Sequence, residues 1–280
     1  MAVQRDTLER IADALERMAS ATASQAGSSK PDWLSAPAYV WDGVSARAVD
    51  RLDALPLETL RGVDEQKAAL NANIERLATG AAAHDALLWG ARGMGKSALV
   101  RAAVASVQAH SPSAIALVQI PGSALAGVSD LIAHLSEVDR AFVLFIDDLG
   151  FDPGQKSQML AVRSLLDGGV MPRPSRVRVA VTSNRRAIVQ RDANERDALH
   201  ERDARDDALA LADRFGLTLG FHPCGRETYL DMLRAYTDPL GLAVDEDEAC
   251  AFAIARGSRS GRIAYQFATE LAGRAGLSLG

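Results

Sequence analysis

The chain has few cysteines and no excess of basic residues, and both shortages exclude classes of protein. Its 280 residues contain two cysteines, Cys224 and Cys250, with no partner at metal-binding spacing, so neither a disulfide framework nor a zinc site is expected. Lys and Arg number 31 against 36 Asp and Glu, a formal net charge of −5. That balance disfavours non-specific coating of nucleic acid, although a small basic patch on an acidic protein still permits nucleic-acid binding.

Long apolar runs are also missing. No stretch of the sequence is long and apolar enough to span a bilayer, and the first residues, Met1 to Asp6, lack the apolar core of a signal peptide. We therefore expect a cytoplasmic protein with no membrane partner. Hydrophobic residues make up 48% of the chain, enough to fill the core of one large domain or two unequal ones.

Three segments precede the regular part of the chain. Residues 1–22 have helical spacing of large apolar residues for about two heptads, at Leu8, Ile11, Leu15 and Met18. This N-terminal helix either packs on its own protein or acts as an arm that contacts a neighbouring molecule. Residues 23–37 are rich in Ala, Ser and Gly and predict a linker. Residues 38–83 predict a helical segment leading into the core, with its clearest helix from about 64 to 78.

The segment 84–224 alternates apolar strands with helical patterns, which indicates an α/β domain with a five-stranded parallel sheet between helices. The expected strands are residues 86–89, 115–120, 141–147, 177–183 and 217–221. The expected helices are residues 96–109, 125–137, 155–167 and 186–213. After residue 225 the strand pattern stops, and helices near 226–236, 245–256 and 261–274 predict a small helical domain over 225–280.

A glycine-rich loop follows the first of these strands and opens a helix. It matches the pattern G-x-x-x-x-G-K-S, and its residues are Gly90, Ala91, Arg92, Gly93, Met94, Gly95, Lys96 and Ser97, with Ala98 next. The glycines let successive N–H groups point at phosphates, and the helix N-terminus adds its positive dipole end. Lys96 supplies a charge to the outer phosphates and Ser97 a hydroxyl to Mg²⁺, so the loop predicts ATP and Mg²⁺ as cofactors.

Two carboxylates end the third strand, which is otherwise fully apolar. Because ligands of open parallel sheets lie beyond the carboxyl ends of the strands, both are expected to face the phosphate loop. We assign Asp147 to Mg²⁺ and Asp148 to the base that orients the attacking water. Asp152 is a weaker alternative for the base.

Taken together, these motifs resemble the AAA+ superfamily and, within it, the bacterial ATP-binding family known as domain of unknown function 815. The resemblance covers roughly residues 55–275. It rests on the loop and on Leu60-Arg61-Gly62-Val63-Asp64, Phe145-Ile146-Asp147-Asp148-Leu149, Thr182-Ser183-Asn184-Arg185-Arg186, Asp213-Arg214-Phe215-Gly216-Leu217 and Arg259-Ser260-Gly261-Arg262.

The resemblance implies roles for further residues. Gly62 and Val63 match the segment that packs on adenine, and Asn184 matches the sensor of the γ-phosphate and attacking water. Arg214 matches the arginine finger, which acts on a neighbouring subunit and so implies an ATP-dependent homo-oligomer. Arg262 matches the second sensor in the lid, with Arg259 as the alternative. The implied activity is hydrolysis of ATP by a switch or loader that acts on an unidentified macromolecular client.

The chain also departs from the AAA+ pattern. Most motors of the superfamily have Glu where this chain has Asp148, and the shorter side chain favours a slow switch or an adaptor that binds ATP without hydrolysing it. Residues 121–127 lack the aromatic pore loop of a peptide-threading unfoldase. The segment 190–212 alternates Arg with Asp or Glu, which is typical of a solvated helix with ion pairs, or else of a docking site. A small-molecule kinase is a further alternative, although no insertion for an acceptor pocket is evident.

Overall fold

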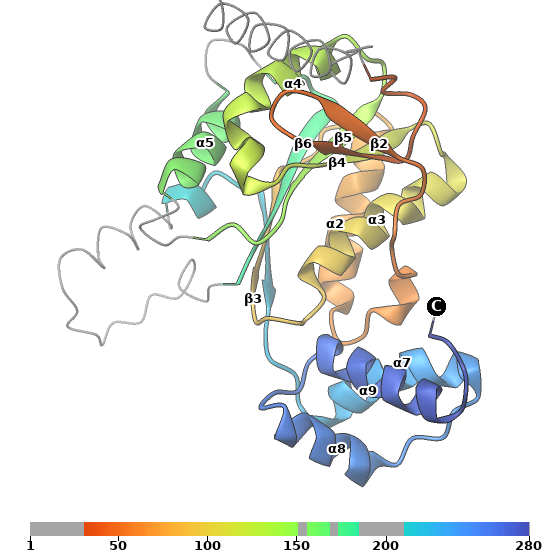
Figure 1. Cartoon of the computed structure of the whole chain (residues 1–280). Helices are drawn as coiled ribbons and strands as arrows, with labels where there is room; N and C mark the ends of the chain where they lie inside the picture. The colour runs from red at the N-terminus through yellow and green to blue at the C-terminus, as the bar shows by residue number, and fades with distance from the viewer. Residues whose placement is uncertain (1–30, 151–155, 169–172, 185–209, 280) are drawn as a thin grey trace, which may run out of the picture. The chain divides into compact units, whose positions relative to one another are not determined.

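The structure is a computed structural model that describes residues 31–150, 156–168, 173–184 and 210–279 (Figure 1). From Trp33 onward the described residues belong to one compact unit. The predicted N-terminal helix 1–22, Asp152 and most of the charged segment 190–212 lie outside the described residues.

A mostly parallel sheet forms the centre of this unit. Its parallel strands are those predicted from the apolar runs: β3 (Ala86–Gly90), β4 (Ile115–Gln119), β5 (Ala141–Ile146), β6 (Val177–Ser183) and β7 (Leu217–Phe221). They lie in the order β4-β5-β6-β3-β7, so β3 lies between β6 and β7, two strands that are distant from it in sequence. Because all five run the same way, the residues that follow β3, β5 and β6 meet at one edge of the sheet.

The sheet has seven strands rather than the five predicted, because β1 (Ala38–Trp41) and β2 (Ala46–Val49) form an antiparallel hairpin beside β4. The prediction of helix at the start of 38–83 is therefore wrong. Tyr39 and Trp41 are buried, and aromatic residues at alternate positions favour a strand that packs one face on the core. The pairing of β1 with β4 is a long-range contact that the local pattern does not reveal.

The end of the predicted linker 23–37 is part of the packed domain. Trp33 is buried and its ring lies 4.8 Å from that of Tyr39, centroid to centroid. The buried Arg140 donates hydrogen bonds to the carbonyl oxygens of Trp33 and Ala36, both at 2.8 Å. These contacts fix the chain that enters the hairpin.

Helices cover both faces of the sheet (Figure 1). On one face lie α2 (Asp64–Ala78) and α3 (Lys96–His110). On the other lie α4 (Val128–Ser136), entered through a 3-10 turn at Gly122–Gly127, and α5 (Lys156–Asp167). Each face therefore has its own apolar core.

The chain after β7 forms the predicted helical lid. Its helices are α7 (Arg226–Thr237), α8 (Glu246–Ala255) and α9 (Gly261–Arg274), with a 3-10 turn at Asp238–Leu240. Tyr229 and Phe267 are fully buried between them. A second short turn, Leu57–Thr59, precedes α2 and contacts both α3 and α7, so the lid packs against the α2 and α3 side of the sheet. In the described part of the chain, the helices are too short or too polar to cross a membrane.

Candidate functional site

The glycine-rich loop connects β3 to α3, and two of its glycines are required by the packing around them. Gly90 has φ 120°, and a Cβ there would lie 2.1 Å from the carbonyl oxygen of Phe221 on β7. Gly93 has φ 74°, and a Cβ there would lie 2.8 Å from Oγ of Ser260 in the lid. The loop is therefore held between the sheet and the lid, in a backbone conformation that L side chains rarely adopt.

Lys96 is the first residue of α3 and is buried. Its ammonium group donates hydrogen bonds to the carbonyl oxygens of Gly90 at 2.9 Å and Ala91 at 2.8 Å. Burial lowers the pKa of Lys96 from 10.5 to about 8; the charges of Asp148 and Asp147 oppose this shift, and those of Arg92 and Arg262 add to it. A desolvated ammonium at a helix N-terminus is well suited to pair with a phosphate.

Asp147 follows β5 and accepts two short hydrogen bonds on one oxygen. The hydroxyl of Ser97 donates to Oδ1 at 2.6 Å, and the hydroxyl of Thr182 donates to the same oxygen at 2.5 Å. Hydroxyl and carboxylate oxygens suit Mg²⁺, which is commonly held by one or two protein groups together with substrate phosphates. Ser97 and Asp147 therefore fit a Mg²⁺ ion, and they lie together as the sequence predicted.

Asp148 has φ 55°, the only positive φ of a described residue that is not glycine. Its N–H donates to Oγ1 of Thr182 at 2.8 Å, and its carboxylate accepts a hydrogen bond from the side-chain amide of Asn184. A left-handed aspartate is a rare conformation, and the hydrogen bonds with Thr182 on β6 and with Asn184 just after it hold this one in place. The candidate base and the candidate sensor are therefore in direct contact.

Thr182 is a site residue that the sequence reasoning missed. Its buried hydroxyl donates to Asp147 and accepts from the N–H of Asp148, so it positions both carboxylates. The motif containing Thr182 was recognised, but only Asn184 was given a role. The register of β5 with β6, which pairs Ile146 with Val181, places Asp147 and Thr182 side by side as the next pair.

The lid contributes Arg262 to the same site. Its backbone N–H donates to the carbonyl oxygen of Gly93 at 3.1 Å, and Ser260 caps the start of α9 through Ile263. Arg262 lines the cavity beside the loop, whereas Arg259 does not. The carbonyl oxygen of Arg259 instead accepts from the thiol of Cys224 at 3.3 Å, so Arg262 is the better placed of the two lid arginines.

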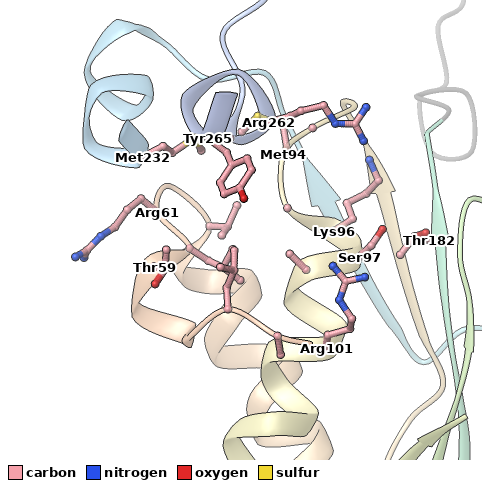
Figure 2. Close-up of a pocket in the computed structure, with 18 of the residues that line it drawn as sticks. Thr59, Arg61, Met94, Lys96, Ser97, Arg101, Thr182, Met232, Arg262 and Tyr265 are labelled. Atoms are coloured by element: carbon pink, nitrogen blue, oxygen red, sulfur yellow. The ribbon is translucent and has the colours of Figure 1, made fainter. Parts of the chain in front are cut away.

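A cavity of about 540 Å³ joins these groups (Figure 2). At one end lie Lys96, Asp147, Asp148, Asn184 and Arg262. The rest of the lining is more apolar, and it consists mainly of Leu55, Leu60, Val63, Met94, Met232, Tyr236 and Tyr265, with the polar Asp53, Thr59 and Arg61 among them. A charged end and an apolar end of this size fit a nucleotide, with its phosphates at the loop and its base against the lid.

Four predicted cofactor-binding residues do not line the cavity themselves. Gly62 lies outside it, where a Cβ would lie 2.2 Å from Cγ2 of Thr228 on α7, so it lets the lid pack closely. Gly90, Ala91 and Arg92 are also outside the lining. Gly90 and Ala91 orient Lys96 through their carbonyl groups, and the charge of Arg92 adds to the lowering of the Lys96 pKa by burial.

Arg214 is not brought to the other site residues. It precedes β7, whose first residue, Leu217, donates to the carbonyl oxygen of Asp85 at the amino end of β3. The phosphate loop lies at the carboxyl end of β3, a strand length of roughly 16 Å away. The Arg214 guanidinium donates to Asp167 at 2.6 Å and to the carbonyl oxygen of Ala210.

Comparisons with known proteins agree on the fold. A family model described as "Protein of unknown function (DUF815)" matches residues 34–275. The RuvB Holliday junction branch migration motor of Thermotoga maritima is 16% identical with a TM-score of 0.51, over 79% of this chain and 66% of that one. Aeropyrum pernix Orc1, solved in complex with DNA, is 17% identical with a TM-score of 0.55, over 77% of this chain and 61% of that one.

The chain therefore spans less than two thirds of the length of these two structures, and identities this low establish the fold alone. A search among curated proteins gives no match.

Proposed function

Since the chain belongs to the family described as protein of unknown function (DUF815) and has the fold of an AAA+ P-loop protein, we propose that it binds ATP with Mg²⁺, hydrolyses it slowly, and acts as a nucleotide-dependent switch or loader. The observation that carries this proposal is the single cavity in which Lys96, Asp148, Asn184 and Arg262 face one another. They supply the positive charges, the carboxylate and the amide that a site for ATP hydrolysis requires.

The proposed chemistry divides between binding and activation. Lys96 and the loop N–H groups hold the outer phosphates, while Ser97 and Asp147 hold the metal, which neutralises charge on the phosphates when bound. Asp148 orients the attacking water and accepts its proton. Arg262 adds positive charge beside the γ-phosphate from the lid. The shorter Asp148 side chain, in place of Glu, supports a slow rate.

Two substitutions separate binding from hydrolysis. Lys96→Ala removes the charge on the outer phosphates, so ATP affinity measured by calorimetry should fall at least about tenfold. Asp148→Asn keeps the size of the side chain but removes its basicity, so ATP should still bind while steady-state phosphate release falls at least about tenfold. Equal affinity of wild type and Lys96→Ala refutes the binding site. Unchanged hydrolysis in Asp148→Asn refutes the base and makes Asp152 the next candidate.

We further propose that Arg214 acts on the ATP of a neighbouring subunit. Its position at the amino end of β7, about a strand length from its own loop, supports action across an interface rather than within the subunit. Subunits arranged head to tail present such an arginine to the next pocket, and that contact closes as a ring or continues as a filament. Arginine fingers contribute about 10³-fold or more to the rate.

A mixing experiment tests the finger. Arg214→Ala subunits keep an intact pocket but supply no finger, and Lys96→Ala subunits supply a finger but bind ATP weakly. Each variant alone should be nearly inactive, whereas the mixture should recover part of the phosphate release. If the mixture stays inactive, or if Arg214→Ala alone is as active as wild type, Arg214 is a structural partner of Asp167 and nothing more.

Two other functions compete with this proposal. The hydrogen bond between Asn184 and Asp148 favours a protein that binds ATP without hydrolysing it, because the candidate base is already engaged. Phosphate release from wild type that stays at background with every candidate partner would support this adaptor. A P-loop kinase is the weaker alternative, because Asn184 and Arg262 would have no phosphate acceptor to serve.

The client of the proposed switch is a macromolecule. One structure of similar fold is a Holliday junction motor and another was solved with DNA, which keeps nucleic acid among the candidates. The net charge of −5 argues against broad contact with a phosphate backbone. Purifying Asp148→Asn with ATP bound, and identifying what co-purifies, tests protein and nucleic-acid clients together.

A further inference from the structure

One charged residue of the cavity has no role in the proposed chemistry. Arg101 lies on α3, one turn after Ser97, and lines the same cavity as the loop. Figure 2 shows its guanidinium directed back along α3 towards Ser97. Side chains on a helix point towards its N-terminus, so this direction follows from the position of Arg101 in the helix.

Arg101 makes no hydrogen bond or ion pair with the residues that the structure describes, and its Nε is buried without a partner. Two other arginines of the domain do have hydrogen-bond partners, although the Nε atom of Arg140 is also buried without a hydrogen bond. Arg140 donates to the carbonyl oxygens of Trp33 and Ala36, and Arg214 donates to Asp167. A cation whose Nε is desolvated and unpaired inside a ligand cavity is poorly stabilised unless a ligand supplies the acceptor.

The position of Arg101 around α3 indicates which part of a nucleotide it faces. At about 100° per residue, Arg101 lies about 40° from Ser97 and about 60° from Ala98, but about 140° from Lys96. It therefore lies on the side of α3 that carries Ser97 and Ala98, and away from Lys96. Ala54 and Leu55 line the same cavity.

Burial lowers the pKa of Lys96, and the charges of Arg92 and Arg262 add to that shift. Lys96, Arg262 and the two carboxylates all line the cavity and make its outer-phosphate end. An anion bound between Ala98 and the apolar end is the phosphate that carries the sugar.

We propose that Arg101 binds the α-phosphate of the nucleotide. This inference rests on the proposed ATP site and adds a contact that does not distinguish ATP from ADP. A guanidinium can form two parallel charge-assisted hydrogen bonds to the oxygens of one phosphate. The site is therefore expected to retain the product ADP through Arg101 while Lys96 and Arg262 respond to the γ-phosphate.

The test compares the dissociation constants of MgATP and MgADP for wild type and Arg101→Gln by calorimetry. Loss of a charge-assisted phosphate contact should weaken both nucleotides by the same factor, about tenfold or more. Arg101→Lys keeps the charge but loses the fork, so it should lose less affinity than Arg101→Gln for both nucleotides. Arg61→Gln is the matched control, because Arg61 also lines the cavity but Figure 2 shows its side chain directed away from Ser97 and Arg101.

Folding is checked by thermal unfolding without nucleotide, where Arg101→Gln should be at least as stable as wild type, because no described partner is lost and an unpaired cation is removed. Affinities of Arg101→Gln within about twofold of wild type would overturn the proposal. So would a loss confined to ATP, which places Arg101 at the γ-phosphate, or an equal loss in Arg61→Gln, which reflects general electrostatics. If wild type itself binds neither nucleotide, the proposed ATP site fails rather than the role of Arg101.

Discussion

The depressed pKa of Lys96 predicts that nucleotide binding depends on pH in a range where a lysine normally does not titrate. Burial lowers this pKa from 10.5 to about 8, so about half of the nucleotide-free molecules carry a neutral Lys96 at pH 8. A phosphate beside the amine favours its charged form, and binding therefore takes up a proton. The expected uptake is about 0.1 proton at pH 7, 0.5 at pH 8 and 0.9 at pH 9.

The same numbers give the change in affinity. The charged fraction of Lys96 falls from about nine tenths at pH 7 to about one tenth at pH 9, so the dissociation constant of MgATP should rise about tenfold over that interval. Calorimetry in two buffers of different ionisation enthalpy measures affinity and proton uptake together. Lys96→Met, which has no amine, should bind weakly with neither effect. A wild-type affinity that is constant between pH 7 and pH 9, without proton uptake, would refute the reasoning.

The stability of the folded protein should rise with pH, whereas its affinity for MgATP falls. The folded pKa of Lys96 lies below its unfolded value, so the folded nucleotide-free protein binds fewer protons than the unfolded chain between about pH 8 and 10.5. Its stability relative to Lys96→Met should therefore rise across that window, by about 3 kcal/mol at most. Urea unfolding of the two proteins at pH 7 and pH 10.5 measures this difference and cancels the titration of all other groups.

Two further predictions concern the contacts that hold the site together. Thr182→Val removes the hydroxyl that positions Asp147 and Asp148, so phosphate release should fall about tenfold while the ATP dissociation constant changes less than about threefold. Thr182→Ser keeps the hydroxyl and should retain the activity. An equal loss of activity in both variants would contradict the positioning role of Thr182. Gly93→Ala places a Cβ 2.8 Å from Oγ of Ser260 at a residue with positive φ, so the free energy of unfolding should fall by about 1–2 kcal/mol. Its control, Gly273→Ala in α9, meets no atom within 4 Å and should be neutral or stabilising.

The sequence predicts the parts of the fold that depend on short continuous segments of the chain. The phosphate loop is one continuous segment, so its glycines and lysine can be recognised from neighbouring residues alone. The alternation of strands and helices in 84–224 can be predicted from the periodicity of apolar residues. The five parallel strands and the three lid helices were confirmed on that basis. A general rule of parallel sheets places Asp147 and Asp148 at the phosphate loop, whereas the role of Asn184 comes from the family resemblance.

The features that were missed depend on contacts between distant segments. The β1–β2 hairpin is short and becomes a stable part of the sheet only by pairing with β4, whose sequence lies more than 60 residues away. Thr182 acquires its role from the register of β5 with β6, which no local pattern specifies. In the sequence Arg101 looks like any other arginine on a helix. Only the structure shows that it lines the cavity and that its Nε has no partner.

The contacts at the carboxyl edge of the sheet also bear on why the proposed hydrolysis is slow. Lys96 donates to its own loop carbonyls, and Asn184 donates to Asp148. Lys96 must exchange those carbonyls for phosphate oxygens, whereas the two N–H groups of Asn184 allow one to stay on Asp148 while the other reaches a γ-phosphate. Sensor and base are then coupled through one side chain: a γ-phosphate that turns the amide also turns the carboxylate. In the proposed mechanism the position of Asp148 would then depend on the nucleotide state, as the proposed switch requires and a fast motor does not.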